Sequence, residues 1–180
     1  MFSLQSRVFE INLKTLFFSI NIFGDTMKTL SKIFAVCALG LAMMAPAHAA
    51  DDKGTSEQAV AMVKKAIAYI KEVGKEKAFA EFANPANTQF HDRDLYLFVY
   101  DLNGNTLAHG NNPKMVGKSL IDLKDGDGKP IIREMITLVN TKGKGWADYK
   151  WPNPVTKTLE QKSSYVEKVD NYFVGCGIYK

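Results

Sequence analysis

Few side chains in this sequence could carry out catalysis, and the histidines are the first to consider. His91 lies in a polar stretch, so we expect it to be solvated, whereas His109 ends a short apolar run. The sequence contains no Gly-rich phosphate loop, no nucleophile elbow and no metal-binding pair of histidines. An enzyme with His109 as general base therefore remains only as a remote alternative, because no nucleophile accompanies it. These residues favour binding over catalysis.

Two acidic stretches resemble calcium-binding loops but lack the required ligands. In the first, 101–105, Asp and Asn alternate, but Thr106 stands where an EF-hand loop needs glycine. Asn112 stands at the position of its bidentate glutamate. In the second, 125–129, a lysine occupies the third ligand position. We expect both stretches to form turns, and we predict neither a metal nor another cofactor.

Residues 27–49 have the three parts of a secretory signal peptide. A basic start leads into the apolar run 33–44, and Ala47-His48-Ala49 fits the small-x-small cleavage rule. The apolar run is shorter than the roughly 20 residues that span a bilayer. We therefore expect a periplasmic protein that begins at Ala50 or Asp51 and has no membrane span after signal cleavage. An uncleaved anchor is the alternative.

Residues 1–26 precede a complete signal, so we interpret them as a wrongly assigned start, untranslated or disordered. Residues 50–180 are enough for one domain. Of the 23 Lys and Arg and the 19 Asp and Glu, four and two respectively fall within 1–49, which leaves a net charge of +2. This near balance, without a Lys/Arg-rich block, argues against a nucleic-acid partner.

One cysteine remains after removal of the signal, because Cys37 lies within it. Cys176 therefore has no intramolecular disulfide partner, and a metal site of paired cysteines is excluded. The residue falls in an alternating apolar run, so we expect a buried, inert thiol. A reactive thiol is the alternative.

Three stretches have the apolar spacing of helices. The first begins after Thr55, a capping residue, and ends at Gly74. A short helix follows over 75–82, and a third covers 129–140. Apolar residues of each helix recur on one side, so each should pack against the sheet described next.

Five stretches have the composition or alternation of strands: 95–100, 106–109, 146–151, 158–169 and 172–179. Asn103-Gly104 joins the first two as a hairpin, and the last three form a meander. Gly175 and Gly177 share one face of the last strand, which leaves a groove there or permits a close approach. The order predicts an α+β domain in which helices cover one side of an antiparallel sheet.

Several phrases resemble, in the family's order, the single Cache domain, type 2: YIKEVGKEKAFAEF, LYLFVYDLNGNTLAHG, NPKMVGKSLIDLKDGDGKPIIREM, GKGWADYKWPNP, and KSSYVEKV with GCGIY. The resemblance runs from about Thr55 to Lys180. It implies a PAS-like antiparallel sheet of about five strands with a long N-terminal helix and a helical crossover. Cache domains are extracytoplasmic sensor modules of chemoreceptors and sensor kinases. They bind small molecules, often short organic acids, in a pocket on the sheet.

We expect five residues to line that pocket: His109, Tyr149, Trp151, Lys162 and Tyr165. Tyr149 and Trp151 share a strand face, and His109 ends a strand. Aromatic rings would shape the site, while Lys or His⁺ would pair with a small carboxylate. His109 titrates near 6.5 if unperturbed. The alternatives are plain core for the rings, a hydrogen-bonded core histidine and a solvated edge lysine.

We therefore predict a solitary, exported Cache protein that binds a short carboxylate as a sensor or binding module. The role that this suggests is signal transduction, with a membrane receptor or kinase as the partner. The alternative is an interaction module that docks on a membrane sensor or transporter and has no tight ligand of its own. Arg133 is expected on the helix surface, and Trp146 on the face opposite Tyr149.

Overall fold

The computed structural model describes residues 53–180, so the predicted signal peptide and the stretch before it lie outside the described residues. Two helices come first, α2 (Ser56–Val73) and α3 (Lys75–Phe82). The Thr55 hydroxyl accepts from the Gln58 N–H, and the Gln58 side chain accepts from the Thr55 N–H. This capping box fixes the predicted start of α2. Gly74, at φ +84°, separates the two helices as expected.

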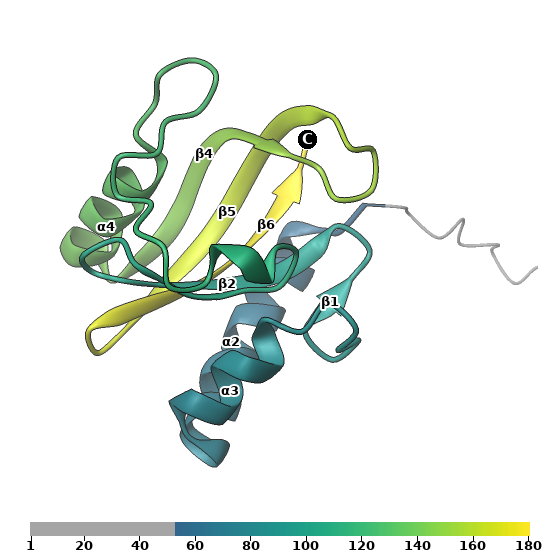
Figure 1. Ribbon diagram of the computed structural model, residues 1–180, viewed down its shortest axis with the longest axis vertical. Helices are drawn as coiled ribbons and strands as arrows, with labels where there is room; N and C mark the ends of the chain where they lie inside the picture. The colour runs from purple at the N-terminus through teal and green to yellow at the C-terminus, as the bar shows by residue number, and fades with distance from the viewer. Residues whose placement is uncertain (1–52) are drawn as a thin grey trace, which may run out of the picture. The chain divides into compact units, whose positions relative to one another are not determined.

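The strands form one antiparallel sheet: β1 (His91–Asp92), β2 (Leu95–Asp101), β3 (Thr106–His109), β4 (Lys144–Pro152), β5 (Leu159–Val169) and β6 (Tyr172–Tyr179). The spatial order is β1-β2-β6-β5-β4, with β3 also beside β2 (Figure 1). The five predicted strands are confirmed, and the two-residue β1 is an addition. The C-terminal strand thus joins the β4–β5–β6 meander to the β2–β3 hairpin.

Alternate residues of β2 face two separate apolar clusters. Leu97 and Val99 pack with α2 and α3, whereas Tyr96 and Phe98 pack with α4 (Ile131–Lys142). The helices consequently lie on opposite faces of the sheet, and the expectation that they share one side was wrong. Each helix buries its own apolar stripe, and the open sheet offers an apolar surface on both faces.

The helix α4 begins two residues later than predicted. Pro130 is its extended N-cap residue rather than part of the first turn. A long connection leads from β3 to this helix and contains the short 3₁₀ turn η1 (Pro113–Met115). This crossover passes over the face that carries Tyr96 and Phe98, and Leu120 and Leu123 pack against that cluster.

Two glycines allow a close approach on this same face, as the sequence predicted. A Cβ atom at Gly175 would lie 2.3 Å from the ring of Phe98. A Cβ atom at Gly177 would lie 2.2 Å from the Ser164 Oγ and 2.4 Å from the Lys162 Cε. The missing side chains of β6 therefore make room for a ring from β2 and a lysine stem from β5.

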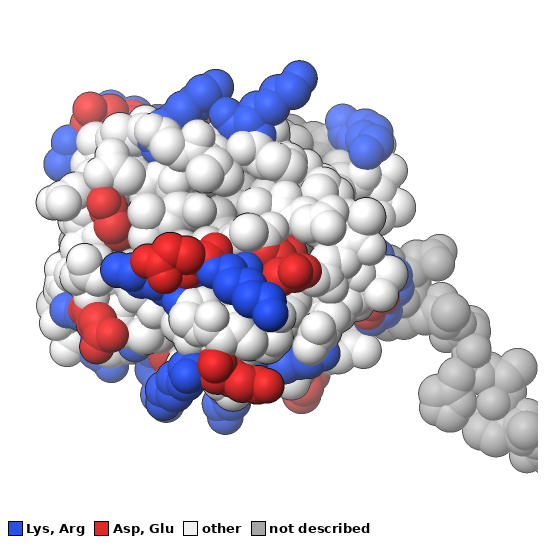
Figure 2. Space-filling model, turned by 60° about the horizontal axis from the view of Figure 1, so that its bottom comes forward, with Lys and Arg blue, Asp and Glu red and all other residues white. Residues whose placement is uncertain are grey.

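The surface shows charges of both signs. On the face in Figure 2, acidic and basic side chains alternate along the middle. Arg133 is exposed on α4 and pairs with Asp122, so its predicted surface position is confirmed. Within residues 53–180, no helix has the length and apolar character needed to cross a membrane.

Candidate functional site

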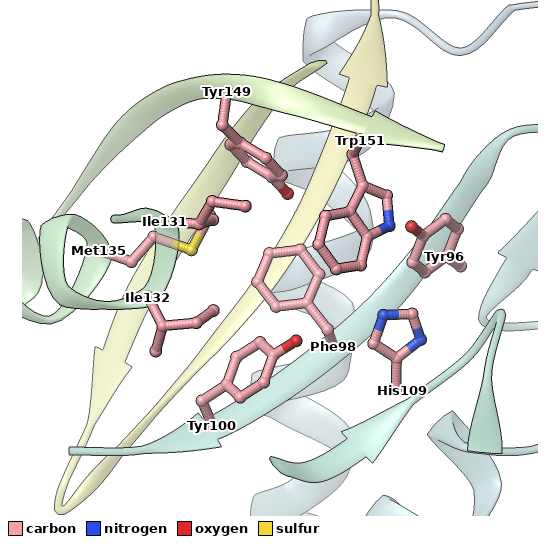
Figure 3. A pocket seen from close by; sticks show the side chains of 9 residues that line it. All are labelled: Tyr96, Phe98, Tyr100, His109, Ile131, Ile132, Met135, Tyr149 and Trp151. Atoms are coloured by element: carbon pink, nitrogen blue, oxygen red, sulfur yellow. The ribbon is translucent and has the colours of Figure 1, made fainter. Parts of the chain in front are cut away.

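A small cavity lies between the sheet and α4, and Figure 3 shows the side chains around it. Its lining consists of Tyr96, Phe98, Tyr100, His109, Ile131, Ile132, Met135, Tyr149 and Trp151. The open volume is about 10 Å³, which is about the space that one water molecule needs. A larger ligand therefore requires some of these side chains to move.

The cavity has a polar end and an apolar end. Figure 3 shows the Tyr96 hydroxyl, the Trp151 indole nitrogen and one imidazole nitrogen of His109 gathered at one end. At the other end lie the aliphatic side chains of α4, among them Ile131 and Met135. Such polarity suits a ligand with a polar head and a short hydrocarbon part.

His109 supplies a neutral hydrogen-bond donor to this cavity. Its side chain is 2% exposed, and its Nδ1 accepts from the Asn112 backbone N–H at 3.0 Å. The neutral ring must then carry its hydrogen on Nε2. Burial, and next the nearby charge of Lys162, lower the pKa of His109 from 6.5 to about 3. The imidazolium considered from the sequence is therefore absent near pH 7.

Lys162 is a buried amine, not the solvated edge lysine that was the alternative. It is 1% exposed, and its Nζ donates to the Tyr179 hydroxyl at 3.2 Å. The same Nζ lies 3.9 Å from the centre of the Tyr96 ring. Within residues 53–180, no Asp or Glu oxygen lies within 4.0 Å of it. Burial lowers the pKa of Lys162 from 10.5 to about 7, although Cys176 and Asp94 act in the opposite direction.

Lys162 does not line the cavity. Two tyrosines, Tyr179 and Tyr96, connect it to the cavity wall. The Tyr179 hydroxyl, which accepts from the lysine, donates to the Pro152 carbonyl at 2.8 Å. It also lies 3.4 Å from the hydroxyl of Tyr96, a residue of the cavity wall. The lysine charge is thus separated from the cavity by one aromatic side chain.

The structure brings together four of the five residues expected from the sequence. His109 and Trp151 lie with ring centres 6.3 Å apart, and those of Tyr149 and Trp151 are 6.0 Å apart. Lys162 is directly opposite Tyr149 in the β4–β5 register. The Tyr149 hydroxyl is engaged with the Ser164 Oγ at 2.8 Å.

Tyr165 is not part of this group, and its assignment to the pocket is corrected. It packs in the cluster on the α2 face, 5.6 Å from the ring of Trp146, and its hydroxyl donates to Glu167 at 2.7 Å. Tyr165 is three positions from Lys162, and side chains along a strand alternate between faces. An odd spacing therefore places the two residues on opposite sides. Trp146 lies on the face opposite Tyr149, as predicted.

Several residues of the site were missed from the sequence, namely Tyr96, Phe98, Tyr100, Tyr179 and the α4 residues. The alternation of LYLFVY already places Tyr96, Phe98 and Tyr100 on one strand face. Tyr179 shares a face with Gly175 and Gly177, which were recognised as unusual. The signal was present, but only the pairing of β2 with β6 connects these tyrosines to Lys162.

The sequence pattern of the family described as Single Cache domain 2 matches residues 34–180. This chain belongs to that family. The members are sensor modules that bind ligands, in agreement with the resemblance noted from the sequence. Residues 53–180 contain no group of three or more His, Cys, Asp or Glu placed to hold a metal ion.

Two curated relatives are signalling proteins. The chain is 36% identical over 91 residues to the sensor histidine kinase MctS of Rhizobium johnstonii, covering 49% of this chain and 20% of that protein. It is 31% identical over 91 residues to the methyl-accepting chemotaxis protein McpP of Pseudomonas putida, covering 49% and 17%. The chain thus spans about a fifth of the length of these relatives.

A solved structure resembles the described domain more fully. It belongs to a study of carboxylic acid recognition by a Cache chemosensory domain. The two chains superpose with a TM-score of 0.60 at 27% sequence identity, covering 69% of this chain and 92% of the other. The shared fold confirms the predicted α+β, PAS-like architecture.

Proposed function

We propose that this protein is an exported Cache domain that binds a short carboxylate in the cavity between the sheet and α4. The observation that carries the proposal is the polarity of this cavity. Neutral donors stand at one end with a buried lysine behind them, and aliphatic side chains stand at the other. A carboxylate with two to four carbon atoms has the same division between an anionic head and an apolar chain.

The carboxylate would lie at the polar end. The His109 Nε2–H and the Tyr100 hydroxyl would donate to its oxygens, since both residues line the cavity and the Nδ1 of His109 is already occupied by the Asn112 N–H. Lys162 would add a favourable charge interaction from behind Tyr96. Opposite unit charges about 4 Å apart, at an effective dielectric constant of about 20, attract by about 4 kcal/mol, and the attraction decreases with distance. The carbon chain would contact Ile131 and Met135 of α4.

The relatives support a role in signalling. One structurally similar Cache domain recognises carboxylic acid, and two sequence relatives are a sensor kinase and a chemotaxis protein. A membrane receptor or kinase is accordingly the partner that we propose. The signal-like pattern of residues 27–49 supports export to the periplasm.

A second candidate function is favoured by the small volume of the cavity, about 10 Å³. In this case the domain would dock on a membrane sensor or transporter without a tight ligand of its own. Because the cavity must enlarge before a carboxylate can enter, the closed form itself could be the one that the partner recognises.

Thermal unfolding in the presence of acetate, propionate, lactate and pyruvate distinguishes the two candidates. A ligand at a hundredfold excess over its Kd stabilises the folded protein by about 2.7 kcal/mol, which raises Tm by several degrees. Acetamide and propionamide are matched neutral compounds and should give no shift. Lys162→Met should remove the shift, whereas Tyr165→Phe, on the opposite face, should preserve it. If no carboxylate raises Tm but a membrane protein is retained in a stable complex, the second candidate is correct.

A further inference from the structure

The position of Lys162 leads to an inference about how the site responds to pH. We propose that binding of a carboxylate is coupled to the uptake of one proton by the Nζ of Lys162. This proposal rests on the proposed carboxylate binding, and it adds that the protein senses the anion together with the acidity of its surroundings.

The first support is the environment of the amine in the unliganded protein. Lys162 is 1% exposed and donates to the hydroxyl of Tyr179. Its other close contacts are the faces of the Tyr96 and Tyr179 rings, at 3.9 and 4.6 Å from their centres. A hydroxyl and two rings stabilise an ammonium far less than water and a carboxylate do. The neutral amine therefore competes with the ammonium at ordinary pH.

The second support comes from the titratable groups that face Lys162 from the neighbouring elements: Asp94 and Tyr96 from β2 and the turn before it, His109 from β3, Tyr149 from β4, and Cys176 and Tyr179 from β6. Burial raises the pKa of all three tyrosines and raises that of Cys176 to about 12. Burial lowers the pKa of His109 to about 3. Each of these shifts moves a group out of the range between pH 6 and 9.

Asp94 is the acidic member of this set. It is 1% exposed, its Oδ1 accepts from the Gly54 N–H at 2.7 Å, and its Oδ2 has no hydrogen-bond partner within residues 53–180. Its charge favours the ammonium form of Lys162, but only as the third contribution after burial and Cys176. An anion bound in the cavity would add a second negative charge near Lys162. The ammonium would then predominate.

Binding of the anion and uptake of the proton form one balanced step. Above pH 7 the unliganded protein carries Lys162 mainly as an amine; a carboxylate anion enters the cavity, and a buffer acid gives one proton to the Nζ. The bound state contains an ammonium and a carboxylate, which together carry no net charge. The reaction consumes one anion and one proton, so above neutral pH the extent of binding depends on the product of their concentrations. That product is proportional to the concentration of the undissociated acid.

The sign of the pH dependence follows from the free and bound states. Burial sets the pKa of Lys162 to about 7 in the free protein, and a bound anion raises it. Below pH 7 the lysine is already protonated, so affinity is nearly independent of pH. Between the free and bound pKa values, proton uptake approaches one, and affinity falls about tenfold per pH unit.

Isothermal titration calorimetry with propionate tests the proposal. At each of pH 6.0 and 8.5, two buffers of different ionisation enthalpy give the number of protons taken up. We expect a value near zero at pH 6.0 and near one at pH 8.5, with weaker binding at pH 8.5. Lys162→Arg carries a permanent charge and should abolish uptake. The control Lys168→Arg, on the same strand but partly exposed, should retain the wild-type behaviour.

The outcomes separate this inference from the proposed function. Binding without proton uptake at pH 8.5 overturns the inference and leaves carboxylate binding intact, whereas no binding at either pH overturns the proposed function. Uptake that persists in a folded Lys162→Arg overturns the assignment to Lys162. If that variant does not fold, the wild-type protein with ¹³C-labelled lysine decides. One Cε resonance should titrate near pH 7 without propionate and at higher pH with it, and unchanged titration overturns the inference.

Discussion

Replacing Lys162 by methionine should stabilise the unliganded protein at pH 6 and have little effect at pH 10. Burial lowers the pKa of Lys162 from 10.5 to about 7. At 1.36 kcal/mol per pH unit, protonating this lysine in the folded protein costs up to about 5 kcal/mol relative to the unfolded chain. Methionine preserves most of the apolar stem and removes this cost.

Part of that gain is offset by contacts that methionine cannot make. Lys162 donates to the Tyr179 hydroxyl and lies against two aromatic rings. A hydrogen bond from a charged group and a buried cation–π contact each contribute about 1–2 kcal/mol. The expected net stabilisation at pH 6 is therefore about 1–3 kcal/mol.

Urea unfolding of both proteins at pH 6, 8 and 10 measures this difference. A lysine with a lowered folded-state pKa destabilises the protein fully below that pKa, and the destabilisation disappears as pH rises toward 10.5. The advantage of Lys162→Met should thus shrink between about pH 7 and 10. Lys168→Met, at a partly exposed position on the same strand, should show no such trend. A Lys162→Met variant that is less stable than wild type at pH 6, or an advantage independent of pH, would show that burial does not disfavour the protonated lysine.

Further predictions concern packing, capping and processing. Gly177→Ala should lower the free energy of unfolding by about 1–3 kcal/mol, because its Cβ would lie 2.2 Å from the Ser164 Oγ; urea unfolding measures this. Thr55→Ala should cost about 1 kcal/mol in the same assay through loss of the capping box. Cys176 is 0% exposed, so thiol labelling should be slow until denaturant is added, and rapid labelling would reopen a redox role. Intact mass of the exported protein should show a start at Ala50 or Asp51, whereas a retained apolar run would mean an anchored protein.

The local elements were predictable because their signals are local. The capping box at Thr55, the glycine at 74 and the Asn-Gly turn each act over a few residues, and the structure has the corresponding boundaries. The placement of α4 was less accurate. Pro130 is compatible both with a first helical turn and with an N-cap, and periodicity alone does not distinguish these positions.

The site was harder to predict because it depends on strands that are distant in the sequence. Tyr96 and Lys162 meet only because β6 pairs with both β2 and β5. The neutral state of His109 depends on burial and on the nearby Lys162, neither of which is visible in the sequence. The error at Tyr165 had a different origin, since the odd spacing from Lys162 was available and was not applied.

Because alternate residues of β2 belong to two different clusters, a single strand separates the α2-face cluster from the cavity. Leu97 faces α2 and Phe98 faces the cavity, although they are neighbours on the same strand. When the cavity enlarges around a ligand, a displacement of β2 must be transmitted to the cluster on the α2 face, because packed interiors compress little. The helix α2 would then be displaced by ligand binding although it does not contact the ligand. Substitutions in the α2-face cluster, for example at Leu97, are consequently expected to change the affinity for the ligand without contacting it.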